Sequence, residues 1–231
     1  GAQTALEAHF SRVAGRGLVI LRSQTGVALF DSEAVVQGSA VSRCDTGYRL
    51  SDSDLDLKES TIRENRVGVE VQRSSFTLSG VKVLNNSQEG VLADQARFRI
   101  NNCLFAENRC GIRLITGDGQ IFLSRFYGNR ENAAELTGVR IRIATSSFFR
   151  NGGAGLLVEN ARGSIVGSSL GENKAGNLIT RGNESFVALL NWWGSADEKQ
   201  IAAGIIEPTR KESAGSVLFD PFLKERPVTD P

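Results

Sequence analysis

Residues 111–129, GIRLITGDGQIFLSRFYGN, decide the fold of this chain. Apolar and polar side chains alternate there in short runs, marked by Ile112 and Leu114, then Ile121, then Phe126. Alternation with a period of two is typical of β-strands that bury one face. No helical apolar stripe runs through the repeat. The stretch therefore predicts three short strands, each with one face turned inward.

The same pattern recurs every 21 or 22 residues along the chain. The landmark positions are Gly26, Gly47, Gly68, Gly90, Gly111, Ala133, Gly155 and Gly176. Eighteen positions after the first seven landmarks stand Cys44, Asn65, Asn86, Asn108, Asn129, Asn151 and Asn173. A repeat of this size cannot bury its inner face alone, so the repeats are expected to stack in register. Phe105, Phe126 and Phe148 would then form an internal aromatic ladder.

Several columns of this stack are expected to be structural. Asparagine can hydrogen-bond the backbone of a turn and the asparagine of the next coil. Glycine suits a bend where a side chain would crowd the backbone. A mostly serine column, thirteen positions after each landmark, is expected to face inward. Counting from Gly176 places Ile179 and Phe186 in inward columns and Trp192 in an outward one.

Leucine-rich repeats are the rival interpretation, because they also run 20–29 residues and carry a similar spacing. That family requires leucine where this chain mostly has serine, and a helix or looser arc where this chain has two more alternating runs. The pattern therefore favours an all-β, single-stranded parallel solenoid of about 8–9 coils. Residues 1–194 are predicted to form it, and residues 195–231 to form a C-terminal capping or packing tail. Within that tail we expect a short helix over 197–206, with Ser195 as its N-cap.

The unit at 111–129 resembles the right-handed parallel β-helix repeat of pectin-lyase-like proteins. The segments NWWG (191–194) and SVLFDPFL (216–223) resemble the end of secreted bacterial β-helix proteins of the carbohydrate-binding and sugar-hydrolase type, including the periplasmic NosD type. The resemblance covers about residues 5–223. It implies the right-handed fold and an extracellular or periplasmic location. It does not select an activity, because this superfamily contains lyases, hydrolases, epimerases and non-catalytic binders.

The amino-acid composition argues against several classes of partner. Lys and Arg total 27 and Asp and Glu 26, so the net charge of +1 argues against a dedicated nucleic-acid binder. No apolar run approaches the ~20 residues that span a bilayer. The lone His9 and the three cysteines show no zinc or copper spacing, which departs from the copper association of the NosD type. Three buried thiols and no cofactor are expected.

Charged residues gather on the outward positions of the predicted second strands. Asp31, Glu33, Asp52, Asp54 and Asp56 form an acidic patch over two adjacent coils. Asp52, Asp54 and Asp56 are the candidate Ca²⁺ ligands, because hard cations take several oxygen ligands. Further along the same face lies a basic stripe of Arg97, Arg99, Arg140, Arg142 and Arg162, with Asp118 inside it. Arginine pairs with carboxylates, so the stripe could bind acidic sugars or lipid phosphates. A purely solvating role for both patches is the competing interpretation.

Aromatic residues mark a second candidate ligand-binding surface, on the third strands. Tyr127 and Phe149, joined by Trp192 if the register persists, would stack outward near Arg125. Exposed aromatic rings suit the apolar faces of sugars. The competing interpretation is that the C-terminal tail covers this column with Leu218, Phe219 and Phe222.

The leading hypothesis is a non-enzymatic exported β-helix that binds a carbohydrate or cell-surface polymer, or serves as a scaffold. One alternative is a polysaccharide lyase or hydrolase that uses Asp52, Asp54 and Asp56 with a nearby arginine. The other is a purely structural interaction module of a larger surface protein. Adjacent acidic and basic patches also make self-association conceivable. No catalytic residue is assigned.

Overall fold

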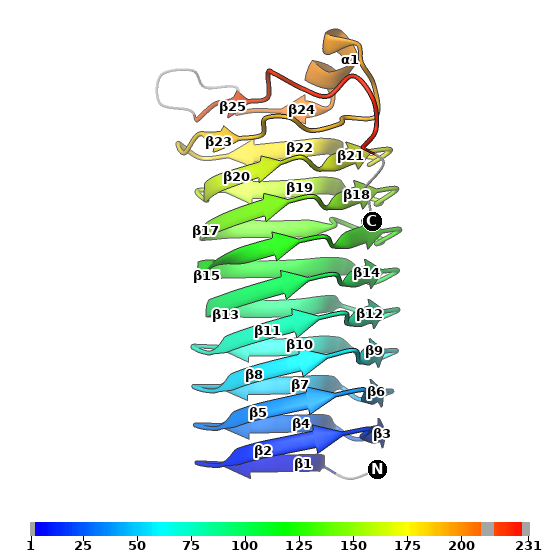
Figure 1. Ribbon diagram of the computed structural model, residues 1–231, viewed down its shortest axis with the longest axis vertical. Helices are drawn as coiled ribbons and strands as arrows, with labels where there is room; N and C mark the ends of the chain where they lie inside the picture. The colour runs from blue at the N-terminus through cyan, green and yellow to red at the C-terminus, as the bar shows by residue number, and fades with distance from the viewer. Residues whose placement is uncertain (1–2, 209–214, 228–231) are drawn as a thin grey trace.

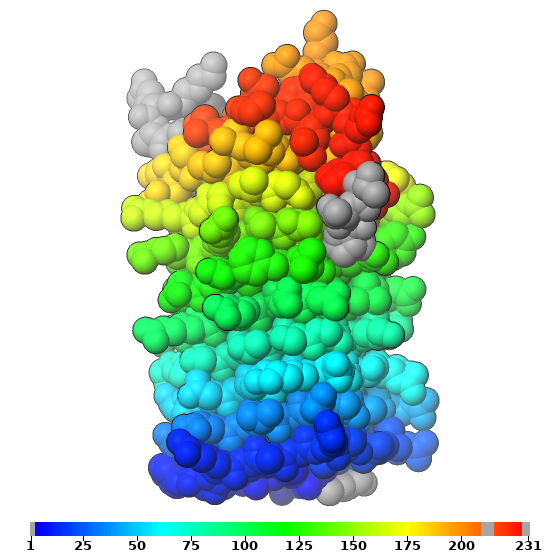
Figure 2. Space-filling model, in the orientation of Figure 1, coloured from blue at the N-terminus to red at the C-terminus, as the bar shows by residue number. Residues whose placement is uncertain are grey.

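Each coil of the chain contributes three strands, and the coils stack into a rod (Figure 1). The computed structural model describes residues 3–208 and 215–227. It is 59% strand and 3% helix and has about nine turns, which confirms the predicted parallel β-solenoid. In the space-filling view the C-terminal segments lie on the last coil at one end of the rod (Figure 2).

The strands fall into three sets according to their place in the coil. The first strands are β1 (Thr4–His9), β4 (Thr25–Phe30), β7 (Thr46–Ser51), β10 (Val67–Gln72), β19 (Ala154–Glu159) and β22 (Gly176–Arg181). The second strands are β2 (Arg12–Arg16), β5 (Glu33–Gln37), β8 (Asp54–Lys58), β11 (Ser75–Ser79), β20 (Arg162–Val166) and β23 (Phe186–Val187). In the middle coils these two sets merge into β13 (Glu89–Asn101), β15 (Cys110–Phe122) and β17 (Ala134–Ala144).

The third strands are shorter and form a sheet of their own. They are β3 (Val19–Leu21), β6 (Ala40–Ser42), β9 (Thr61–Arg63), β12 (Lys82–Leu84), β14 (Leu104–Ala106), β16 (Arg125–Tyr127), β18 (Ser147–Phe149) and β21 (Ser169–Gly171). Among the described residues this sheet has eight strands, and the first and second strands belong to a 17-stranded sheet with the tail strands. Neighbouring coils pair in parallel, so each strand continues the ladder of the coil before it.

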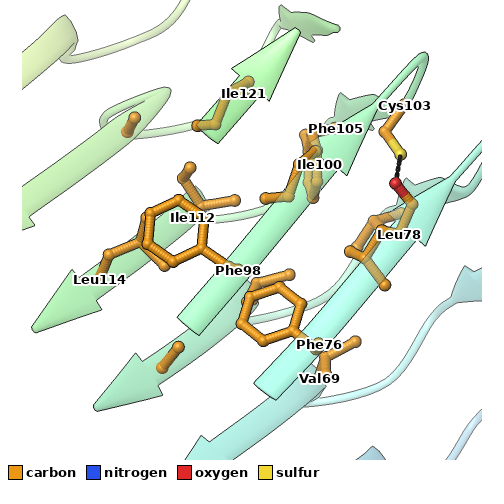
Figure 3. Packing of buried hydrophobic residues seen from close by; sticks show 14 of the residues in the cluster. Val69, Phe76, Leu78, Phe98, Ile100, Cys103, Phe105, Ile112, Leu114 and Ile121 are labelled. Carbon is orange, nitrogen blue, oxygen red and sulfur yellow. Dashed lines mark hydrogen bonds between the residues drawn. The ribbon is translucent and has the colours of Figure 1, made fainter. Parts of the chain in front are cut away.

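Equivalent side chains stack directly on one another in the core. Phe105, Phe126 and Phe148 pair in register, with ring centroids 4.7 Å apart and planes within 6°. This confirms the predicted aromatic ladder. Figure 3 shows Ile100, Phe105 and Ile121 pointing into the same interior from neighbouring strands. The core is therefore a set of columns.

Glycine and asparagine occupy the turn between the third strand and the next coil for separate reasons. A Cβ on Gly68 would collide with the carbonyl oxygen of Gly90 in the next coil, so crowding excludes a side chain there. Asn86 accepts from Asn65 N and Nδ2 at 3.0 and 3.2 Å, and the same pairing repeats between Asn86 and Asn108. These bonds satisfy backbone groups that the turn removes from the strand ladder.

Serines form two columns of side-chain bonds to the backbone. In the predicted column, Ser60 Oγ accepts from Ser39 N at 3.0 Å and donates to Lys58 O at 2.6 Å. A second column, not predicted, does the same where the first strand meets the second: Ser53 Oγ accepts from Ser32 N at 3.1 Å. Each hydroxyl therefore ties one coil to the coil before it.

Two register predictions for the last coil are wrong. Ala154 pairs with Gly176 and Leu156 with Leu178, so Asn177 and not Gly176 holds the landmark position. Ile179 consequently pairs with Leu157 on the outer face. A further inserted residue follows, because β19 and β22 pair 22 residues apart but Gly163 and Phe186 pair 23 apart. Phe186 is buried, but two positions earlier in the coil than predicted.

The tail closes the C-terminal end of the rod. Strand β24 (Ile205–Ile206) pairs with β22, and β25 (Val217–Leu218) pairs with β23. Helix α1 spans Glu198–Ala203, inside the predicted range. Its N-cap is Asp197, whose side chain accepts from Lys199 N, and the prediction of Ser195 is wrong. Ser195 Oγ instead accepts from Asp197 N at 3.0 Å and supports the cap.

All three cysteines are free and buried, as predicted. Cys103 stands in the serine column and donates to Asn101 O at 3.2 Å and Leu78 O at 3.4 Å (Figure 3). Burial raises the pKa of the Cys103 thiol to about 11, and burial also raises the pKa of the Cys110 thiol. Both are neutral thiols that fill core space.

Candidate functional site

A groove of about 810 Å³ runs along the outer face of the second strands from β2 to β15. These strands lie on the side nearer the viewer in Figure 1. Two outward columns line the groove. The first is Arg12, Glu33, Asp54, Ser75, Arg97 and Asp118, and the second is Ala14, Val35, Asp56, Thr77, Arg99 and Gln120. The first column continues past the groove through Arg140 and Arg162, and the second through Arg142. The predicted acidic and basic patches therefore lie along one face.

The acidic end of this face is largely paired with basic side chains. Asp52 accepts two hydrogen bonds from Arg73, at 2.7 and 3.0 Å, and these bonds hold the pKa of Asp52 below its usual value. Asp56 lies 2.7 Å from Lys58 Nζ. Asp54 is exposed and makes no ion pair with a described residue. Within residues 3–208 and 215–227, no group of three His, Cys, Asp or Glu side chains could hold a metal ion.

The basic end carries a rectangle of four arginines. We call Arg97, Arg99, Arg140 and Arg142 the arginine rectangle; all four are exposed, and none forms an ion pair with another described residue. Asp118 and Gln120 lie between its two rows. Arg162, predicted to belong to the same stripe, is instead held by Glu184 at 2.7 Å. The guanidinium groups of the rectangle are therefore accessible to an anionic ligand.

Two glycines allow the groove wall to form at β15. Gly117 takes φ of +108°, and a Cβ there would collide with the backbone of Ala96. Gly119 lies over the ring of Phe98, which fills the space that a side chain at 119 would need. Gly117-Asp118-Gly119 therefore holds Asp118 between the arginine rows and is not a phosphate loop.

The aromatic column on the third strands is only partly as predicted. Tyr127 and Phe149 pair in register and border a pocket of about 330 Å³ together with Arg125. Tyr127 is 39% exposed, and its hydroxyl accepts from Arg150 at 3.1 Å. The tail does cover part of the column, but through Arg226, whose guanidinium lies 4.6 Å from the Phe149 ring centroid.

Trp192 does not join this column, so that prediction is wrong. It pairs with Ser169, which places it in the neighbouring column of Ser147 and Arg125. The cause is the shifted register of the last coil. Trp193 is the buried tryptophan, and Phe219 of the tail packs edge-on against it at 6.5 Å.

A cluster of buried charge on the outside of the first strands was not predicted. Glu89 is 5% exposed and lies 3.0 Å from Arg109 and 3.5 Å from Arg113. Arg113 also contacts Glu135 at 2.7 Å. The sequence repeat could have predicted this cluster, because it brings Glu89, Arg113 and Glu135 onto adjacent coils. The pairing compensates charges removed from water and ties successive coils together.

The fold and its groove define the class: a parallel β-helix repeat protein with a charged outer face. The chain belongs to the family described as periplasmic copper-binding protein (NosD), whose model matches residues 5–141. A search of curated proteins by sequence gives no match.

The chain also aligns with two solved structures. The A-module of the mannuronan C-5 epimerase AlgE6 of Azotobacter vinelandii aligns with a TM-score of 0.57 and 12% identity over 92% of this chain. The chain spans 65% of the length of that module. The periplasmic alginate epimerase AlgG (a D317A mutant) aligns with a TM-score of 0.38 and 13% identity, over 94% of this chain and 74% of that one. At 12% identity the likeness to the AlgE6 module shows the fold alone.

The residues described here do not fit a copper site. His9 is the one histidine of the sequence, and its Nε2 lies 2.7 Å from Glu7 on an exposed strand. Copper favours imidazole and thiolate or thioether ligands, whereas the three cysteines are buried in the core, two of them with raised pKa values. No helix of the described residues is long and apolar enough to cross a membrane.

Proposed function

We propose that this chain is an exported, non-enzymatic β-helix that binds an acidic polysaccharide along the face of its second strands. The arginine rectangle carries the proposal: two exposed guanidinium groups on β13 and two on β17, with β15 between them, form no ion pair with a described residue. Guanidinium groups pair with carboxylates through two parallel hydrogen bonds. A polymer lying along the rod would meet these groups in succession. The family description, periplasmic, supports an exported location.

The acidic end supports binding rather than catalysis. Glycoside hydrolysis requires one carboxyl group with a raised pKa to protonate the leaving group. The hydrogen bonds from Arg73 act on Asp52 in the opposite direction, and Lys58 neutralises Asp56. Asp54, which forms no ion pair with a described residue, keeps its negative charge on the face and disfavours an anionic polymer at that end.

Isothermal titration with oligouronates at low salt tests the proposal. The paired substitution Arg97→Ala with Arg140→Ala should weaken binding roughly 5- to 30-fold, since exposed charge pairs contribute up to ~1 kcal/mol each. Lys82→Ala is the matched control, because Lys82 is an exposed cation on β12, away from this face. Added salt should weaken wild-type binding by screening. Unchanged affinity of the doubly substituted protein for oligouronates would refute the proposal. Absence of binding together with dimerisation in solution would favour a scaffold.

Tyr127 and Phe149 are proposed as a second, weaker sugar contact. Tyr127 is the accessible member, since Arg226 lies over Phe149. Tyr127→Ala should reduce binding of a neutral or acidic glycan at this pocket without changing binding at the arginine rectangle. Glycan binding that is unchanged in Tyr127→Ala would refute this proposed contact.

A further inference from the structure

The charges along the arginine rectangle alternate in sign. In the first outward column Arg97, Asp118 and Arg140 stand on successive coils, in register. In the second column Arg99, Gln120 and Arg142 do the same. Along the rod, a row of two arginines is therefore followed by a row with one carboxylate and one amide, and then by a second row of two arginines.

The fold sets the spacing of these rows. Successive coils are ~4.8 Å apart along the rod, so the two arginine rows are roughly 10 Å apart. Within a row the two arginines are two residues apart on one strand, or roughly 7 Å. A pyranose ring is comparable in size with one coil step. Consecutive sugars of a polymer lying along the rod would therefore meet the first arginine row, then Asp118 and Gln120, then the second arginine row.

Asp118 selects against negative charge at the middle position. It is exposed, and it makes no ion pair with either neighbouring arginine. A sugar carboxylate placed over it would be repelled, and like charges in contact are costly in recognition. A hydroxyl or amide N–H at that position would instead donate to the Asp118 carboxylate or the Gln120 carbonyl oxygen.

We propose that the ligand is a polysaccharide in which acidic and neutral sugars alternate, with its carboxylates on the arginine rows and a neutral sugar over Asp118 and Gln120. This rests on the proposed function and adds the repeat of the ligand. The site ends toward the N-terminus at Ser75 and Thr77, beyond which the unpaired Asp54 would repel further negative charge. Between two and four sugars would thus contact the protein closely.

Three hexasaccharides test the repeat: a hyaluronan hexamer, with a carboxylate on every second sugar; a galacturonate hexamer, with one on every sugar; and neutral cellohexaose. Wild-type protein should bind the hyaluronan hexamer at least as tightly as the galacturonate hexamer, although it carries half the charge. Asp118→Asn should tighten binding of the galacturonate hexamer roughly three- to tenfold and change binding of the hyaluronan hexamer by less than about twofold. The control is Glu107→Gln, an exposed carboxylate that follows β14 on the third-strand side of the coil and should alter neither.

The outcomes separate the two proposals. If neither acidic hexamer binds in a manner that requires Arg97 and Arg140, the proposed function fails. If both bind through these arginines, but the galacturonate hexamer binds more tightly and Asp118→Asn changes nothing, acidic polysaccharide binding stands and the alternating repeat is overturned. Binding of cellohexaose as tight as that of the hyaluronan hexamer would overturn both.

Discussion

Asn108 holds three consecutive coils together through one buried side chain. Its Oδ1 accepts from Asn86 N at 3.0 Å and from Asn86 Nδ2 at 2.8 Å. Its Nδ2 donates to Val83 O at 3.0 Å and to Asn129 Oδ1 at 3.2 Å. The residue is 0% exposed, so water cannot replace these partners without entering the core. Asn108→Ala would therefore take this partner from Asn86 N, Asn86 Nδ2 and Val83 O, whereas Asn129 Oδ1 would still accept from the backbone N of residue 108 at 3.1 Å.

The expected cost follows from those three groups. An orphaned buried donor or acceptor costs ~1–3 kcal/mol, and partial rearrangement lowers the sum. We expect Asn108→Ala to reduce the free energy of unfolding by about 3–6 kcal/mol. Asn173 is the informative comparison, because it makes four equivalent bonds but is half-buried at the end of the column. Because Asn173 itself is part-exposed, water can enter the space that its side chain leaves, so Asn173→Ala should cost only about 1–2 kcal/mol.

Urea unfolding followed by circular dichroism measures both variants, with exposed Asn183→Ala as the control for loss of an amide. Two results would refute the reasoning. One is an Asn108→Ala protein within about 1 kcal/mol of the wild type, which would mean the bonds contribute little. The other is an equal loss in Asn173→Ala, which would mean that burial does not set the cost.

Four further predictions concern stability. Phe126→Ala should cost about 4 kcal/mol because it opens a cavity in the aromatic ladder, and Phe126→Leu less than half of that in the same urea assay. Arg113→Ala should cost about 3 kcal/mol, because it takes the arginine from Glu135 and leaves Glu89 with Arg109 alone. Adding Glu89→Gln should recover part of this loss, and no recovery would show that Glu89 does not contribute to it. A hydrogen bond from Arg66 lowers the pKa of Asp45 below its ordinary 3.8. The stability that ionised Asp45 contributes is therefore fully present above pH 3.8 and is lost as the pH falls through the lower pKa of the folded state. Melting curves recorded at decreasing pH should show a smaller loss of Tm in Asp45→Asn than in the wild type. Calcium binding at the acidic patch stays a prediction, and it requires a Ca²⁺-dependent rise in Tm that Asp54→Ala abolishes. A wild-type Tm that calcium does not change would refute it.

The sequence predicted the inward columns because the interior permits few residue types at each position. Phe105, Phe126 and Phe148 repeat at 21 and 22 residues, and a shift of one position would turn all three outward. The serine column between the first and second strands was missed, because serine occupies it only in the early coils. The corners were not predictable either: Leu123 takes φ of +48°, which its side chain does not indicate.

The outer face was harder to predict than the core. Column counting placed Arg97, Asp118 and Arg140 correctly, because charge at an outward position does not alter the register. It could not show which arginines are paired, since Arg162 meets Glu184 through the lengthened connection before β23. The same lengthening misplaced Trp192, because a glycine at 176 imitated a landmark one residue early.

Cysteine cross-linking tests most directly the register on which the columns, the groove and the arginine rectangle depend. Thr77 and Arg99 are Cα partners on adjacent coils, and Gln120 lies one coil further. A disulfide spans Cα atoms about 4.4–6.8 Å apart, which admits neighbouring coils and excludes a separation of two coils. Oxidised Thr77→Cys/Arg99→Cys should therefore lose two titratable thiols, and Thr77→Cys/Gln120→Cys should keep them. A cross-link in the second protein and none in the first would contradict the fold and the site built on it.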